Sequence, residues 1–366
     1  MEATSTSPTF VKPPRLAPGD TVAAVSLSSG LASLFPHRYE AGKRQFEEAF
    51  GVRVVDAPHA LEDDAWLRRN PEARADDLRW ALTNPEVKGM ISTIGGDDSV
   101  RLLPYLDPQL IRANPKVMMG FSDTTITLTA FLNAGVVAFH GPAFMTDLAE
   151  NGGIVPTVEQ SIRQTLFDAQ PAPWQAAPSW TEEFLDWSDP ANQARPRRFE
   201  ANPGWRWLQG EGPVEGHVIG GSVEVLELLK GTPWWPRREL WQSAVLMLET
   251  TEEVPTPSMV ERFVRNYGHQ GILSEVAGML LARPMGYTAE HIDELERRVR
   301  EVLAEFGREE MPLVTGLDTG HTSPHVVVPL GCRVRVDPTS RTITSLEPAV
   351  ADDDVTQRPG DRPPDR

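Results

Sequence analysis

The sequence contains a single cysteine, Cys332, among its 366 residues. One thiol excludes an internal disulfide framework and any metal site built from several cysteines. Cys332 lies in residues 331–336, where polar and apolar residues alternate as they do in a β-strand. We therefore interpret it as a structural residue.

Positive charge and long apolar runs are also scarce. The chain has 35 Lys and Arg against 52 Asp and Glu, a formal net charge of −17 at pH 7. Nucleic-acid binding needs clustered Lys and Arg, so the charge argues against such a partner. No apolar run approaches the roughly 20 residues that cross a bilayer, and residues 1–11 lack the features of a signal peptide. We expect a cytoplasmic protein without a membrane partner.

Strand-like and helix-like segments alternate in the first part of the chain. This alternation predicts an α/β fold with a parallel sheet covered by helices on both faces. Chemistry in such sheets lies at the carboxyl ends of the strands. The expected strands are residues 21–27, 52–56, 89–94, 117–121 and 136–140, and the expected helices are 36–50, 70–84, 99–106 and 123–134.

The rest of the chain divides into three parts. Residues 169–211, the Trp-rich segment, lack periodicity but contain five tryptophans, which argues against a mere spacer. Short alternating strands and three helix-like pieces then predict a smaller β-rich α/β domain over residues 212–348. Residues 349–366 have little apolar content and are expected to be a disordered tail. The first domain is expected to span residues 14–168.

One serine follows directly after the expected strand at residues 117–121. A strand–serine–helix turn lifts the hydroxyl of Ser122 out of the sheet and leaves the first helical N–H groups free beside it. Such N–H groups can hold the oxyanion that forms when a serine attacks a carbonyl. Ser122 is therefore a candidate nucleophile, which needs a base and an acid that orients the base.

The candidate base is one of eight histidines. Most of them lie on expected helices or in polar turns, where a solvated or structural role is typical; the eight are His37, His59, His140, His217, His269, His291, His321 and His325. His321 differs because it lies in a loop between two expected strands, residues 316–324, although a structural role stays open. Glu249 ends an apolar strand, where a buried carboxylate usually has a designated partner. A Glu249 side chain turned to solvent is the alternative.

The order Ser, Glu, His also occurs in α/β-hydrolases. Their nucleophile turn reads Gly-x-Ser-x-Gly, whereas Thr124 stands here in place of the second glycine. This departure counts against a generic esterase.

Six segments, taken in order, resemble the LD-carboxypeptidase family of serine peptidases, and the resemblance extends over about residues 14–348. The segments are residues 93–98 (TIGGDD), 120–123 (GFSD), 139–142 (FHGP), 217–222 (HVIGGS), 248–253 (LETTEE) and 320–324 (GHTSP), the last followed by 330–331 (LG). The resemblance implies a triad of Ser122, Glu249 and His321 that works without a metal or a cofactor.

The resemblance also implies an oxyanion hole and an architecture. The backbone N–H groups of Gly96 and Asp123 are the expected oxyanion donors, and Gly95 belongs to the same glycine loop, which lets backbone approach the substrate. The family implies a Rossmann-like N-terminal domain that carries the nucleophile. It further implies a C-terminal domain that carries the acid and the base, a cleft between the two domains, and a homodimer.

Two branches of the family differ in substrate. One releases D-alanine from murein tetrapeptides, and the other resembles the microcin C self-immunity peptidase, which cleaves the amide between an aspartyl residue and a nucleotide-like group. The Trp-rich segment favours the second branch, because Phe184 and Trp187 resemble its adenine-binding aromatic pair. Aromatic rings stack on a base with about 1–3 kcal/mol. Packing of both rings on the protein's own surface is the alternative.

We therefore expect a serine peptidase or amidase that cleaves the amide between an acidic aminoacyl group and a nucleotide-like moiety. Its partner is a small molecule or short peptide. A murein tetrapeptide carboxypeptidase with the same triad is the first alternative. A non-catalytic small-molecule binding protein is the alternative from another class.

Overall fold

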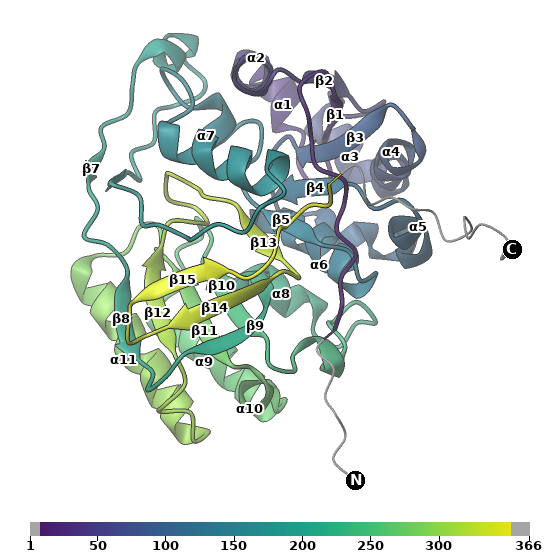
Figure 1. The fold of residues 1–366 in the computed structure, drawn as a ribbon. Coiled ribbons are helices and arrows are strands. Elements are labelled where there is room, and N and C mark those ends of the chain that lie inside the picture. Colours follow the sequence, from purple (N-terminus) through teal and green to yellow (C-terminus); the bar gives the residue numbers. More distant parts are fainter. Residues whose placement is uncertain (1–7, 353–366) are drawn as a thin grey trace, which may run out of the picture.

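Two sheets with flanking helices make up the structure (Figure 1). It is a computed structural model that describes residues 8–352. Within those residues, no helix combines the length and the apolar character that a membrane crossing requires.

The first sheet has six strands in the order β13-β5-β4-β3-β1-β2. Five are parallel, and β13 pairs antiparallel with β5. The strands are β1 (Thr21–Val25), β2 (Arg53–Asp56), β3 (Val87–Ser92), β4 (Val117–Gly120), β5 (Ala138–His140) and β13 (Val328–Leu330). Its α-helices are α1 (Leu31–Leu34), α2 (Pro36–Phe50), α3 (Asp64–Arg69), α4 (Pro71–Thr83), α5 (Pro108–Ala113), α6 (Thr125–Asn133) and α7 (Pro156–Ile162).

The second sheet is mixed and has seven strands in the order β15-β14-β9-β10-β11-β12-β8. The four central strands β9 to β12 are parallel, and the outer three are antiparallel to their neighbours. The strands are β8 (Arg206–Gln209), β9 (Val214–Ser222), β10 (Val245–Glu249), β11 (Gly278–Ala282), β12 (Leu313–Leu317), β14 (Arg333–Asp337) and β15 (Thr342–Ser345). Its helices are α8 (Val223–Leu229), α9 (Pro257–His269), α10 (Ile272–Glu275) and α11 (Ala289–Glu305). The predicted α/β fold class is confirmed.

Short helical turns and a two-stranded ribbon connect these elements. They are the 3-10 turns η1 (Ser99–Tyr105), η2 (Ser122–Thr124), η3 (Asp147–Ala149), η5 (Pro190–Ala194) and η6 (Arg238–Leu240), the π-turn η4 (Arg163–Phe167), and the ribbon of β6 (Ser179–Trp180) and β7 (Glu200–Ala201). The segment predicted as a helix over residues 99–106 is a 3-10 helix that contains Pro104. Proline lacks the N–H that an α-helix interior needs, which fits the tighter turn.

Two strands and the segment after residue 348 cross the predicted domain boundaries. β13 completes the first sheet although it lies within residues 212–348, and β8 completes the second sheet from within the Trp-rich segment. After residue 348, Val350 is buried and the Ala351 N–H donates to the Pro13 carbonyl at 2.8 Å. The remainder of the predicted tail, residues 353–366, lies outside the described residues.

The segment at residues 217–222 joins the two domains. Gly221 has φ +142°, and a Cβ there would lie 2.7 Å from Cγ2 of Thr125 at the start of α6. The Ser222 N–H donates to Thr125 Oγ1 at 3.1 Å. Because α6 begins just after Ser122, this contact fixes the turn that holds the serine against the second sheet.

Candidate active site

Ser122 lies on a strained turn at the carboxyl end of β4. Its φ is +56°, a left-handed conformation that is uncommon for residues other than glycine and that is often found at functional sites. The chain then continues through η2 into α6, so the predicted strand–serine–helix arrangement is present. A Cβ on Gly95 would lie 2.8 Å from the Ser122 Cβ, so only glycine lets this loop approach the serine so closely.

Two backbone N–H groups lie free beside the serine. Among residues 8–352, neither the Gly96 N–H nor the Asp123 N–H has a hydrogen-bond acceptor. Gly96 has φ +142°, and a Cβ there would lie 2.5 Å from Ser28 Oγ. Unpaired N–H groups at this position are available to bind an oxyanion.

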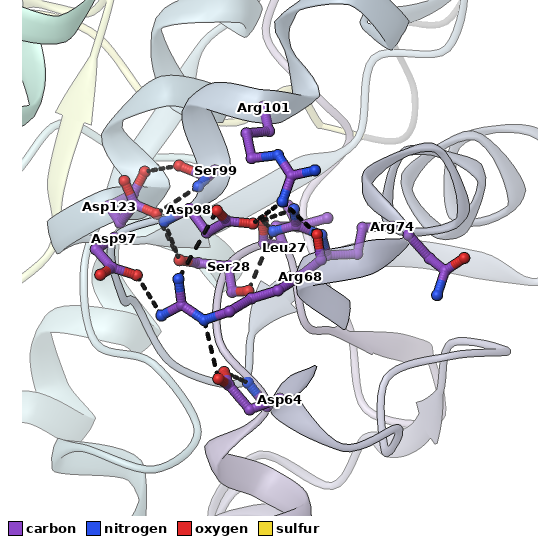
Figure 2. Close-up of polar contacts among 12 residues, drawn as sticks. Leu27, Ser28, Asp64, Arg68, Arg74, Asp97, Asp98, Ser99, Arg101 and Asp123 are labelled. Carbon is purple, nitrogen blue, oxygen red and sulfur yellow. Dashed lines mark hydrogen bonds and ion pairs between the residues drawn. The ribbon is translucent and has the colours of Figure 1, made fainter. Parts of the chain in front are cut away.

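The Asp123 carboxylate ties the glycine loop to the nucleophile turn (Figure 2). It accepts hydrogen bonds from the Ser28 hydroxyl and from the Ser99 N–H, the latter at 2.7 Å. The Ser99 hydroxyl donates back to the Asp123 carbonyl at 2.6 Å. The side chain of Asp123 thus fixes where its own N–H and that of Gly96 lie.

A buried ion pair supports the same loop (Figure 2). The fully buried Arg74 pairs with Asp98 at 2.6 Å and donates to the carbonyls of Leu27 and Ser28 at 3.0 and 3.1 Å. Each of these partners needs the others, because an unpaired buried charge is costly. The two aspartates of the TIGGDD segment thus have structural roles: Asp98 here, and Asp97 in an exposed pair with Arg68.

The predicted acid and base are in contact. Glu249, at the end of β10, accepts a hydrogen bond from His321 Nδ1 at 2.6 Å. The Glu249 side chain is fully buried and that of His321 is 8% exposed. Gly320 makes this approach possible, since a Cβ there would lie 2.7 Å from Glu249 Oε2. The alternative in which Glu249 faces solvent is wrong.

The two groups hold each other in the charged state. Burial opposes the positive charge of His321, but Glu249 and Glu252 outweigh it and raise the pKa of His321 to about 10. Burial likewise opposes the negative charge of Glu249, but His321 and His140 outweigh it and hold the pKa of Glu249 well below its usual value.

Two further histidines lie behind this pair, and sequence reasoning gave them no role. His140 Nε2 lies 3.6 Å from Glu249 Oε1, and His140 Nδ1 lies 3.3 Å from His325 Nε2. Both are fully buried, and burial lowers the pKa of His325 well below its usual value. His140 ends β5, beside the end of β4, so its place at the carboxyl edge of the sheet was a signal in the sequence.

The second ring nitrogen of His321 contacts Glu252. The distance from Nε2 to Glu252 Oε2 is 2.8 Å, and no hydrogen bond joins His321 to Ser122 Oγ among the described residues. Both Ser122 and His321 nevertheless line one cavity of about 320 Å³. That volume is typical of small-molecule sites.

Residues from both domains and the Trp-rich segment line this cavity. Phe184 and Trp187 are among them, with ring centroids 5.7 Å apart and ring planes at 49°. Phe184 is 64% exposed, whereas Trp187 also packs edge-on against Phe35 and lies under the guanidinium of Arg38. Trp187 thus packs on the protein's own surface, whereas Phe184 contacts Trp187 and leaves most of its ring exposed.

Two arginines in the cavity wall were missed by sequence reasoning. Arg38 and Arg197 both line it, and each is held by buried partners, Asn151 and Glu150 respectively. Nothing local in the sequence marks these arginines, because their partners are distant along the chain. No cluster of three or more His, Cys, Asp and Glu in the described part of the chain is suited to holding a metal ion.

Comparison with known protein families shows which family has this architecture. The LD-carboxypeptidase N-terminal domain matches residues 22–141, and the LD-carboxypeptidase C-terminal domain matches residues 215–336. The chain therefore belongs to the LD-carboxypeptidase family of hydrolases.

Individual relatives match different shares of the chain. The microcin C7 self-immunity protein MccF of Escherichia coli is 28% identical over 336 residues, 91% of this chain and 94% of the relative. A murein tetrapeptide carboxypeptidase of Pseudomonas aeruginosa is 34% identical over 119 residues, only 32% of this chain and 38% of the relative.

The similar solved structures include MccF itself and an MccF-like protein. An MccF-like protein from Streptococcus pneumoniae in complex with AMP has a TM-score of 0.80 and 27% identity, over 89% of this chain and 98% of that one. MccF in complex with glutamyl sulfamoyl guanosine has a TM-score of 0.80 and 26% identity, over 93% of this chain and 99% of that one.

Removal of the Asp123 carboxylate should misplace the two free N–H groups. In Asp123→Ala the Ser28 hydroxyl and Ser99 N–H lose their acceptor, and we expect labelling of Ser122 by a fluorophosphonate to slow about 100-fold. Asp123→Asn keeps one acceptor oxygen, so the labelling rate should fall less than in Asp123→Ala. Equal labelling rates in both variants and the wild type would contradict this role.

The His321–Glu249 pair should make stability depend on pH. The pKa of His321 is raised on folding, so its contribution is complete below about pH 6.5 and is lost as the pH rises towards 10. The pKa of Glu249 is lowered, so its contribution is lost only on acidification. The wild type should therefore lose up to about 1.4 kcal/mol per pH unit relative to His321→Gln between pH 7 and 10. Urea unfolding of the wild type and of His321→Gln at pH 6, 8 and 10 measures the two free energies of unfolding. A difference between them that stays constant with pH would contradict this prediction.

Proposed function

We propose that this hydrolase cleaves the amide between an acidic aminoacyl group and a nucleotide-like moiety, with Ser122, His321 and Glu249 as a triad. The observation that carries the proposal is one cavity that contains Ser122, His321 and the aromatic rings of the Trp-rich segment. The predicted homodimer and cytoplasmic location belong to the same proposal.

The reaction follows from the contacts of the three residues. Ser122 Oγ attacks the carbonyl carbon while neutral His321 accepts the hydroxyl proton at Nε2. Glu249 holds the Nδ1–H, which fixes the ring orientation and stabilises the imidazolium. The N–H groups of Gly96 and Asp123 bind the oxyanion.

The second half of the reaction uses the same groups in reverse. His321 gives its proton to the leaving nitrogen, and the amine departs as the acyl-enzyme forms. Water then loses a proton to His321 and attacks the ester of Ser122. The carboxylic acid leaves, and the serine hydroxyl regains its proton.

A nucleotide-like leaving group suits the aromatic side of the cavity. A base between two parallel rings needs about 7 Å between the ring planes, twice the van der Waals contact distance. The rings of Phe184 and Trp187 are closer and inclined, so a base either parts them or stacks on the exposed face of Phe184. Binding of AMP and of a sulfamoyl nucleoside by the solved relatives supports this substrate class.

Two arginines in the cavity wall can pair with the carboxylate of an acidic aminoacyl group. The guanidinium groups of Arg38 and Arg197 lie there, and a buried positive group favours an anionic substrate. Four carboxylates, those of Asp147, Glu182, Glu183 and Glu252, also line the cavity and offset this field, so the arginines favour an anion only at their own end of the cavity.

Replacement of the nucleophile tests the reaction. Ser122→Ala should retain its unfolding midpoint but lose hydrolysis of aspartyl sulfamoyl adenosine by at least about 10³-fold, because no other group can form the acyl-enzyme. The matched measurement uses a murein tetrapeptide with a terminal D-alanine. Faster release of D-alanine would favour the murein activity, and binding of either compound without turnover by the wild type would favour a non-catalytic binding protein.

Truncation of the exposed ring tests the nucleotide side. Phe184→Ala should weaken AMP binding about 5- to 100-fold, the loss expected from one stacking partner. Leu34→Ala is the matched control, since Leu34 is 63% exposed but does not line the cavity. Isothermal titration with AMP measures both, and unchanged binding by Phe184→Ala would exclude stacking on this ring.

A further inference from the structure

Glu252 occupies the atom of His321 that the reaction needs. The proposed reaction requires Nε2 to accept the Ser122 proton, yet Nε2 lies 2.8 Å from Glu252 Oε2. A protonated Nε2 that donates to a carboxylate cannot accept a second proton. The structure of the free protein therefore holds the base in a form that cannot act.

Glu252 differs from the other groups around His321 in its freedom to move. Glu249 holds Nδ1 from a fully buried position, while His140, His325 and Phe121 pack on the buried side. The Glu252 side chain is 58% exposed and lines the cavity.

The backbone beside Glu252 is anchored, which leaves the side chain as the moving part. The N–H and the hydroxyl of Thr251 both donate to Glu224 Oε1 at 2.9 Å. The Glu253 N–H donates to Thr251 Oγ1 at 3.3 Å. Rotation of the Glu252 side chain thus needs no rearrangement of the loop.

We propose that Glu252 is a substrate-sensing gate, whose carboxylate blocks His321 in the free enzyme and moves to the ammonium group of an aminoacyl substrate. The inference rests on the proposed function, since it requires Ser122 and His321 to react with an acyl group. It assigns the substrate class more narrowly: the amino acid beside the scissile carbonyl carries a free, charged amino group.

The exchange of partners is balanced in charge and protons. Before binding, Glu252 and Glu249 together raise the pKa of His321 to about 10, so the imidazole is charged at neutral pH. Departure of Glu252 removes one of the two negative partners and lowers the pKa of His321, so a larger fraction of His321 releases its Nε2 proton to solvent. The carboxylate keeps a cationic partner, because the substrate ammonium replaces the imidazolium. The Glu252 side chain is 58% exposed, so water reaches this carboxylate during the exchange.

Selectivity follows from the same exchange. A substrate whose amino group is acylated carries no charge at that position and leaves Glu252 on His321. Such a substrate meets a blocked base and should react slowly. The gate therefore distinguishes aminoacyl compounds with a free amino group from N-acylated compounds of similar shape.

A neutral probe tests the blocked base without any substrate. At pH 7, a fluorophosphonate should label Ser122 about tenfold faster in Glu252→Ala than in the wild type, because the pKa of His321 is lower without Glu252 and a larger fraction of the imidazole is neutral. The dependence of the labelling rate on pH should shift to lower pH in the same variant. Glu253→Ala is the matched control and should behave as the wild type, and Ser122→Ala should not be labelled. Equal or slower labelling of Glu252→Ala would overturn the gate.

A pair of substrates tests the sensing. The wild type should cleave aspartyl sulfamoyl adenosine at least about tenfold faster than its N-acetyl counterpart, and Glu252→Ala should lose this preference. A preserved preference in Glu252→Ala would overturn the sensing role while the proposed hydrolysis stands. If neither compound is cleaved but labelling still accelerates in Glu252→Ala, the gate is supported and the proposed substrate fails.

Discussion

The contact between His321 and Glu249 is the interaction on which the site depends. It joins a buried carboxylate at the end of β10 to a loop after β12, and each group keeps the other charged against the cost of burial. Because Nδ1 is fixed, the ring can present only Nε2 to the cavity. Glu252 and Ser122 then compete for Nε2, and this competition controls whether His321 can act as a base.

Backbone geometry brings the nucleophile to this pair. Ser122 accepts a left-handed conformation, and glycines stand where a Cβ would clash: Gly95 against Ser122, Gly221 against Thr125, and Gly320 against Glu249. Strained or side-chain-free positions of this kind lower stability, so the presence of Ser122, Gly95 and Gly320 around one cavity indicates function. Hydrogen bonds and ion pairs of Arg74, Asp98 and Asp123 stabilise the glycine loop and the turn.

Most elements of the first domain and the turn at Ser122 could be predicted from the sequence, whereas contacts between distant residues could not. Alternation of apolar runs and helical spacing predicted β1 to β5 and the turn at Ser122, because these patterns are local. The place of β13 in the first sheet could not be predicted, since strand pairing across about 190 residues leaves no local pattern. The same holds for Glu252, whose partner His321 is distant in sequence. The oxyanion roles of Gly96 and Asp123, the triad and the homodimer stay predictions.

A crystal structure of Ser122→Ala with aspartyl sulfamoyl adenosine tests the central claim most directly. The account predicts the scissile carbonyl oxygen at the N–H groups of Gly96 and Asp123, and His321 Nε2 turned towards residue 122 and the carbonyl carbon. It also predicts that Glu252 lies on the ligand ammonium. A ligand bound elsewhere in the cavity, with Glu252 still on His321 and no path from Nε2 to residue 122, would contradict the account.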